Sequence, residues 1–245
     1  MLLLSLAIVS NPCIADRRYT DSMGTVRGNK QIKSKSRVEE HGEVFTSSRE
    51  VKAMLDLVKE ETDRIDSRFL EPACGNGNFL IEVLHRKLSA INKKYRNNQL
   101  DYERYTFIAV TSLYGIDLLE DNALECRQRL YHEVEKLYTK KYKTNGTPSF
   151  LASIQYVLSQ NIVCGDSLHM TTKSGGYITF PEWSIVTGSK VKRRDFIFRT
   201  LLGSSESNTT FSMVNGVNQS SRGEFIPTPV RDYPLIDFRE VAQHE

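Results

Sequence analysis

The sequence FLEPACGNGNFL, residues 69–80, decides the fold class of this 245-residue chain. It begins with a short apolar run, typical of the end of a buried strand, and continues into a turn that contains Gly75 and Gly77. An apolar pattern at helical spacing follows at once, with Phe79, Leu80, Val83, Leu84 and Leu88. A strand that passes through a glycine turn into a helix is typical of the ligand-binding loop of an open α/β sheet, where ligands bind beyond the carboxyl ends of the strands.

The residues of this loop narrow the class of ligand. No Lys-Ser or Lys-Thr pair follows Gly77, so the loop is not the phosphate loop of an NTPase. The dinucleotide pattern GxGxxG is also absent, and Glu71 at the strand tip would repel a pyrophosphate. A carboxylate there suits a ligand with cationic and hydroxyl groups, such as S-adenosylmethionine. An ordinary strand–helix turn would also account for two glycines taken alone.

The loop resembles motif I of the S-adenosylmethionine-dependent DNA methyltransferases that modify the exocyclic amine of adenine, and most closely the M subunits of restriction–modification systems. The resemblance runs from about residue 37 to about residue 168. It implies a class I methyltransferase fold, which is a Rossmann-like, doubly wound, mostly parallel sheet with helices on both faces. It also implies that motif I binds the cofactor through Glu71, Pro72, Ala73, Cys74, Gly75, Gly77, Asn78 and Phe79.

A second motif precedes the loop. Residues 42–47, GEVFTS, resemble the family's Gly-x-Phe-Phe/Tyr-Thr-Pro motif, with Ser47 in place of Pro. In the family this motif closes over the methionine end of the cofactor, which implies that role for Phe45 and Thr46. Ser47 and Glu50 have the spacing of a capping box, so the start of a capped helix would account for Thr46 as well.

Two further motifs each end a predicted strand with an acidic residue. In YGIDLLEDN, residues 114–122, the resemblance implies that Asp117 accepts hydrogen bonds from both ribose hydroxyls. A helix N-cap is the alternative role of Asp117, and the two roles can coexist. In NIVCGDSL, residues 161–168, it implies that Asp166 accepts from the amino group of the adenine. The remaining cofactor contacts implied by these two motifs are Ile116 and Leu118, which flank the adenine ring, and Ser167.

The expected catalytic motif is missing. The family carries Asn/Asp-Pro-Pro-aromatic soon after the Gly-Asp motif, where it holds the flipped-out base. This chain has GYITFPEWS, residues 176–184, in which Glu182 is a candidate acceptor for an amine and Trp183 a candidate stacking ring. A strand followed by a packing tryptophan is the favoured interpretation of Pro181, Glu182 and Trp183, so the catalytic residues stay unassigned.

Charge and cysteine content limit the classes of partner. A net charge of +3 permits a nucleic-acid partner without requiring one. The densest basic cluster is residues 190–199, in which Lys192, Arg193 and Arg194 are candidate contacts to DNA phosphates. The solvated face of a short helix is the alternative.

The four cysteines form no CxxC pair, which predicts reduced thiols in a cytoplasmic protein, without a disulfide or a metal centre.

Three regions are expected. Residues 1–36 form a flexible basic extension, 37–202 the methyltransferase domain, and 203–245 a polar linker with a Pro-containing tail. The apolar run 1–10 is similar to a secretory signal, but it lacks a basic n-region and is too short to span a bilayer, so no membrane partner is expected. Met23 is a candidate native start, and no room is found for a target-recognition domain.

The leading hypothesis is an adenine-specific DNA methyltransferase, or the core of an M subunit, that works by placing the two reactants. Its expected partners are DNA and a restriction or specificity subunit. The second hypothesis is a non-catalytic module that binds S-adenosylmethionine and works with a partner chain carrying the missing motif. A methyltransferase acting on protein or small molecules is a third.

Overall fold

The structure, a computed structural model, describes residues 2–3, 31–201, 218–219 and 225–243. Its central element is a sheet in the strand order β1-β2-β3-β4-β5. Strands β1 (Leu2–Leu3), β2 (Phe69–Glu71), β3 (Leu113–Asp117) and β4 (Ile162–Asp166) run parallel, and β5 (Thr171–Thr172) pairs antiparallel with β4. The parallel strands bring the expected acidic tips of β2, β3 and β4 to one edge of the sheet.

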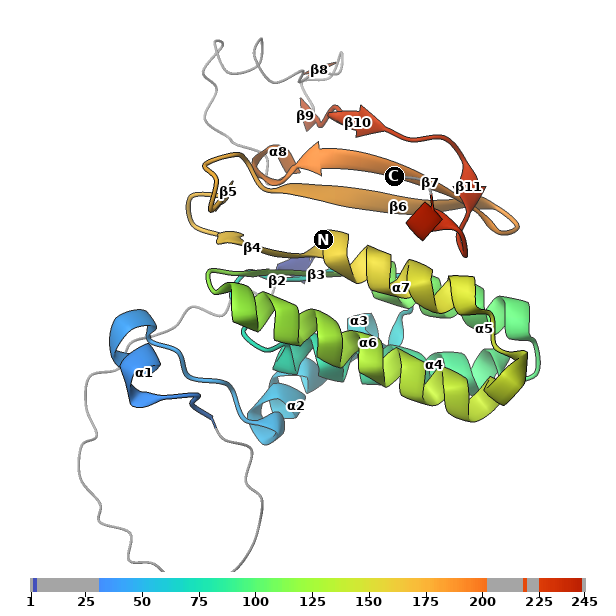
Figure 1. The fold of residues 1–245 in the computed structure, drawn as a ribbon, viewed down its shortest axis with the longest axis horizontal. Helices are drawn as coiled ribbons and strands as arrows, with labels where there is room; N and C mark the ends of the chain where they lie inside the picture. The colour runs from blue at the N-terminus through green and yellow to red at the C-terminus, as the bar shows by residue number, and fades with distance from the viewer. Residues whose placement is uncertain (1, 4–30, 202–217, 220–224, 244–245) are drawn as a thin grey trace, which may run out of the picture.

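Helices α1 to α7 of the described chain pack on or beside this sheet (Figure 1). After the short α1 (Lys35–His41) come α2 (Ser48–Asp56) and α3 (Lys59–Asp63). The four longer helices are α4 (Asn78–Tyr95), α5 (Gln99–Thr111), α6 (Glu120–Tyr142) and α7 (Pro148–Asn161), with the 3-10 turn η1 (Lys143–Asn145) between α6 and α7. The capping box predicted at Ser47 and Glu50 is confirmed at the start of α2.

The two faces of the parallel sheet are covered differently. Successive strand side chains point to opposite faces, so Phe69 and Leu113 pack against the helices whereas Leu70 and Tyr114 face the other way. The helical face holds the larger core, to which α4, α5, α6 and α7 all contribute. The opposite face, with Leu70, Tyr114 and Ile116, packs against the start of a second sheet and α8 (Phe198–Leu201).

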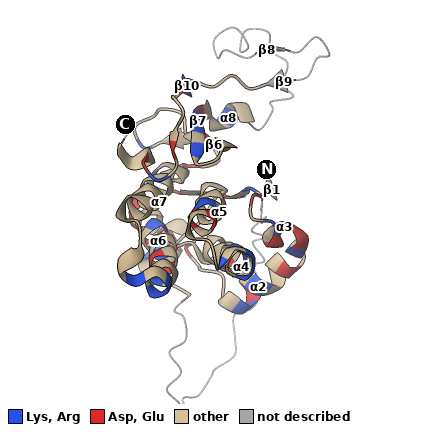
Figure 2. Cartoon of the chain, turned by 90° about the vertical axis from the view of Figure 1, so that its right-hand side faces the viewer, with Lys and Arg blue, Asp and Glu red and all other residues tan. Residues whose placement is uncertain are grey.

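The second sheet is built on β6 (Thr179–Thr187) and β7 (Lys190–Ile197), an antiparallel pair. Its other strands, β10 (Arg231–Asp232) and β11 (Ile236–Asp237), pair with β7, and it lies above the helical layer in Figure 2. The short helix considered for residues 190–199 is wrong over most of its length, because Lys190–Ile197 is a strand with partners on both edges. A separate pair joins β8 (Asn218–Gln219) and β9 (Phe225–Ile226).

The C-terminal residues contribute to the main core. Phe238 is fully buried, with its ring 5.4 Å from that of Phe107, and Val241 in η2 (Val241–Gln243) packs in the same cluster. Most of the expected N-terminal extension, with Cys13 and Met23, lies outside the described residues. In the part of the chain that is described, no helix is long and apolar enough to cross a membrane.

Candidate ligand-binding site

A cavity of about 260 Å³ lies over the glycine loop, at the carboxyl end of β2. Two stretches that are far apart in the sequence line it: His41, Gly42, Glu43, Val44, Phe45 and Thr46 on one side, and Glu71, Pro72, Ala73, Cys74, Gly75, Asn76, Asn78 and Phe79 on the other. The structure therefore brings together the two sequence motifs that the resemblance implies bind the cofactor.

A larger cavity, of about 750 Å³, lies on the outer helical face among α2, α4 and α6. Helix side chains such as His85 and Glu133 line it, and no strand-tip carboxylate does. Because ligands of parallel α/β sheets bind beyond the carboxyl ends of the strands, we place the candidate site at the smaller cavity.

Glu71 is the charged group buried in this site. It ends β2 and is 7% exposed, and its Oε2 atom has no hydrogen-bond partner. Burial raises the pKa of this carboxyl group to about 8, although the backbone N–H of Ala73 donates to it. An unpaired carboxylate oxygen at a cavity wall is costly unless a ligand supplies a donor or a cation. The group therefore fits a ligand that carries a positive charge.

The glycine loop needs its two glycines. Both have left-handed backbone conformations, with φ of 52° at Gly75 and 88° at Gly77. A Cβ atom would lie 2.9 Å from the Phe45 ring at Gly75 and 2.6 Å from the Cys126 Sγ at Gly77. The loop consequently packs directly under Phe45, which is itself buried.

Asp117 fixes the loop to the next strand. Its Oδ2 atom accepts from the Gly75 N–H at 2.8 Å, and its Oδ1 atom accepts from the Leu119 N–H at 2.9 Å and from Asn122 Nδ2 at 3.1 Å. The alternative role of Asp117 as a helix N-cap is wrong, because the N-cap residue of α6 is Leu119. The Asp117 side chain instead accepts from the Leu119 N–H and closes a turn before the helix. It does not line the cavity in this conformation.

The other residues implied for the adenine end lie at the ends of β3 and β4. Asp166 accepts from the N–H groups of Leu168 and His169 and from the His169 ring, and the His169 side chain holds the pKa of Asp166 below its usual range. Leu118 is half exposed, whereas Ile116 is fully buried in the core beneath the second sheet. Ser167 follows Asp166 in the turn after β4.

The residues considered for base binding lie at the opposite edge of the sheet. Trp183 Nε1 donates to Asn161 Oδ1 at 3.0 Å, just before β4 begins. Glu182 accepts from Arg68, which immediately precedes β2, and from Arg194. Pro181 lies beside them and accepts through its carbonyl from Tyr114. The structure thus places Pro181, Glu182 and Trp183 near the amino ends of the parallel strands, away from the cavity.

The basic cluster on β7 is paired internally. Lys192 forms an ion pair with Asp232, Arg193 with Asp195 at 2.8 Å, and Arg194 with Glu182 at 2.6 Å. The Arg193 guanidinium also lies 4.4 Å from the centre of the Tyr233 ring and 5.3 Å from that of Trp183. The side chains proposed to contact DNA therefore also hold the second sheet together.

The remaining titratable side chains include three thiols and a charged cluster beside the cavity. In the described residues, no group of three or more His, Cys, Asp or Glu side chains is arranged to hold a metal ion, and Cys74, Cys126 and Cys164 are free thiols. Sequence reasoning missed a polar cluster beside the cavity, formed by Lys33, Arg37, Glu43, Asp121 and Glu125. Lys33 and Arg37 are 88 and 84 residues from Asp121 in the sequence, and only the acidic first turn of α6 hinted at a basic partner.

The mixed α/β fold, the parallel strands and the cavity over a glycine loop fit a methyltransferase. A comparison with protein-family models supports this class, because the model for the MmeI DNA-methyltransferase domain matches residues 45–174, more than half of the chain. The chain belongs to this family, which supports the expected DNA methyltransferase of restriction–modification type. Neither the curated proteins nor the solved structures gave a match. Adenine specificity and the subunit type stay predictions.

Proposed function

We propose that the chain binds S-adenosylmethionine in the cavity over the glycine loop and is the methyltransferase core of an enzyme that modifies the adenine amine of DNA. The observation that carries the proposal is the buried Glu71 carboxyl group, whose Oε2 atom has no hydrogen-bond partner, in a cavity whose opposite wall is residues 41–46. The family match supports the reaction class, and a DNA methyltransferase domain implies use of this cofactor in general. The finer assignment to the class I methyltransferase fold belongs to the same proposal. The expected helical layers on both faces are not found in the described residues, where the second sheet and the short α8 cover the other face of the parallel sheet.

The residues that line the cavity and the two acidic residues at the tips of β3 and β4 have proposed roles. Glu71 faces the cationic end of the ligand, and Gly75 lets the backbone approach it closely. Phe45 and Thr46 exclude water from the same end. Asp117 and Asp166 contact the ribose and the adenine once the ligand is bound. When bound, S-adenosylmethionine supplies an electrophilic methyl group, so the protein's task is to orient it and to keep the site dry.

We propose that Pro181, Glu182 and Trp183 do not bind the target base. Glu182 and Trp183 hold the second sheet onto the amino ends of the strands, so neither lies where a base would meet the cavity. We therefore expect the isolated chain to bind the cofactor but to transfer methyl groups to DNA slowly. The assay is transfer of labelled methyl to mixed-sequence DNA, with and without a candidate partner. Rapid transfer by the chain alone, lost in Trp183→Ala, would contradict this part of the proposal.

Calorimetric titration with S-adenosylmethionine tests the cofactor site. We expect the wild-type chain to bind, and Glu71→Gln to lower the affinity by roughly tenfold or more. The bound cation lowers the pKa of Glu71, and the ionised carboxylate then forms a charge-assisted hydrogen bond that contributes about 1.5–3 kcal/mol. Glu135→Gln is the matched control, since it makes the same chemical change on α6, outside the cavity lining. No binding by the wild type, or equal affinity in Glu71→Gln, would overturn the proposal.

A further inference from the structure

The segment that forms the outer wall of the cavity is held with little apolar packing of its own. Helix α1, Lys35–His41, has no buried residue. The segment is closed by a backbone hydrogen bond of 2.7 Å from the Phe45 N–H to the Gln31 carbonyl, and Phe45 is its buried apolar anchor. Something other than burial must therefore keep residues 31–44 against the domain.

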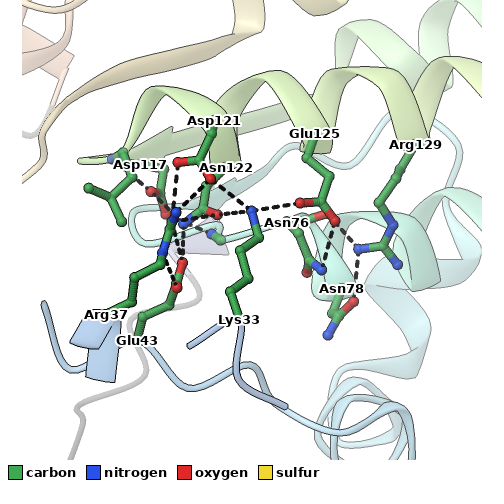
Figure 3. Close-up of polar contacts among 12 residues, drawn as sticks. Lys33, Arg37, Glu43, Asn76, Asn78, Asp117, Asp121, Asn122, Glu125 and Arg129 are labelled. Carbon is green, nitrogen blue, oxygen red and sulfur yellow. Dashed lines mark hydrogen bonds and ion pairs between the residues drawn. The ribbon is translucent and has the colours of Figure 1, made fainter. Parts of the chain in front are cut away.

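That role falls to the α1 ion-pair cluster, defined as Lys33, Arg37, Glu43, Asp121 and Glu125 (Figure 3). Arg37 holds Glu43 with two nitrogens, at 2.5 and 2.8 Å, and reaches Asp121 at 2.7 Å. Lys33 bridges Asp121 at 3.0 Å and Glu125 at 2.7 Å. Hydrogen bonds from Arg37 hold the pKa of Asp121 well below its usual range. Two cations of the segment are thus fastened to the first turns of α6.

The cluster is connected to the glycine loop by hydrogen bonds. Glu43 Oε1 accepts from Asn122 Nδ2 at 2.6 Å, and the same nitrogen donates to Asp117 Oδ1 at 3.1 Å. Asp117 in turn accepts from the Gly75 N–H. Asn122 is 2% exposed, so its amide needs these acceptors. A continuous path of contacts therefore leads from Arg37 to the loop over which the cavity lies.

We propose that Arg37 is a positioning residue that keeps the cavity wall of residues 41–46 closed. Its contact with Asp121 must break before a ligand can enter or leave the cavity. The inference rests on the proposed function, because it concerns the same cavity. Bidentate arginine–carboxylate contacts in a network are stronger than single surface pairs. Arg37 and Asp121 are nevertheless partly exposed, at 24% and 53%, so salt weakens their attraction. Such a closure is firm at low salt and opens more often as salt rises.

Hydrogen exchange of the Phe45 amide tests the closure without any ligand. We expect exchange in the wild type to speed up as salt rises, and Arg37→Gln to exchange about fivefold faster at low salt with little further response to salt. Arg37→Lys, which keeps the charge and loses the second contact, should fall between them. Arg239→Gln is the control, since it breaks a comparable pair with Asp237 elsewhere. Unchanged exchange in Arg37→Gln would overturn the inference.

A double-mutant cycle then asks whether the cluster controls the ligand. We expect Arg37→Gln and Asp121→Asn each to raise the dissociation rate of S-adenosylmethionine about fivefold, and the double variant to raise it by less than the product of the two effects, because both remove the Arg37–Asp121 contact. Additive effects, or an unchanged dissociation rate, would contradict the positioning role. If the wild type binds no S-adenosylmethionine, the proposed function fails, while the exchange measurement still decides whether the closure exists.

Discussion

The pKa of Glu71 makes the stability of the folded chain depend on pH. Its pKa is about 8 in the folded chain and near 4.5 in an unfolded one, because burial disfavours the charged form. Between these two values the folded state keeps a proton that the unfolded state has lost. The Glu71 contribution to stability therefore falls as the pH rises from about 4.5 to about 8.

The corresponding prediction concerns Glu71→Gln. Between pH 5 and pH 7.5, the free energy of unfolding of the wild type should fall relative to that of the variant, with a slope of up to about 1.4 kcal/mol per pH unit. Urea unfolding at several pH values measures it. If the free energies of unfolding of the wild type and of Glu71→Gln change in parallel with pH, Glu71 is ionised in the folded chain.

Lys87 shows the reverse dependence. Its amine is fully buried and donates to the Ser67 carbonyl and the Ser112 hydroxyl, each at 2.5 Å, and burial lowers its pKa to about 7. The unfolded chain keeps the proton up to about pH 10.5, so the Lys87 contribution to stability rises from about pH 7 to that value. We expect Lys87→Met to lose this rise, as measured by denaturant unfolding at pH 7 and pH 9.5. If the free energy of unfolding of Lys87→Met still rises between pH 7 and pH 9.5, a titrating group other than Lys87 causes the rise.

At the scale of the element, β7 is the central strand of the second sheet, and its cations hold neighbouring strands. Arg193 lies among Tyr156, Trp183 and Tyr233 and pairs with Asp195. Arg193→Ala should therefore lower the free energy of unfolding by about 3–5 kcal/mol, because it leaves Asp195 buried without its partner. Lys192→Ala, which removes a more exposed pair, should change it by about 1 kcal/mol or less. Equal effects in thermal or urea unfolding would argue against this role of Arg193.

Elements with a strong local signal could be predicted from the sequence. The glycine loop, the capping box at Ser47 and the helical periodicity of α4 each depend on residues within a few positions of one another. Strand β7 could not be predicted in this way, because its conformation depends on pairing with β6, β10 and β11. Its charged residues alternate poorly, so the local pattern was compatible with a helix as well.

The candidate site also has parts that could be predicted from the sequence and parts that could not. The motifs around Phe45 and Glu71 could be predicted and line one cavity. The α1 ion-pair cluster could not, since Lys33 and Asp121 are 88 residues apart and charged pairs leave no pattern in a single sequence. Trp183 was expected to follow a strand, but it lies within β6. Its direction is set by packing against Phe107 and Tyr156, which only the assembled fold determines.

For the molecule as a whole, the C-terminal residues complete the main core. Phe238 packs against Phe107 and Phe150, which belong to α5 and α7. Phe238→Ala should cost about 3–5 kcal/mol of stability, as expected for a large buried ring. Leu235→Ala is the control, because Leu235 is about half exposed and should lose far less. A small effect of Phe238→Ala in urea unfolding would mean that this segment docks only weakly.

The position of Trp183 also gives the chain a built-in optical signal. It is the only tryptophan in the sequence, and its indole lies where the second sheet meets α5 and α7, hydrogen-bonded to Asn161 and flanked by Arg193. Its fluorescence emission therefore comes from that junction alone. Separation of the second sheet from the helices should shift the emission to longer wavelength, whereas filling the cavity at the other edge should leave it unchanged. A spectral change on adding ligand would reveal that the second sheet moves when the cavity fills.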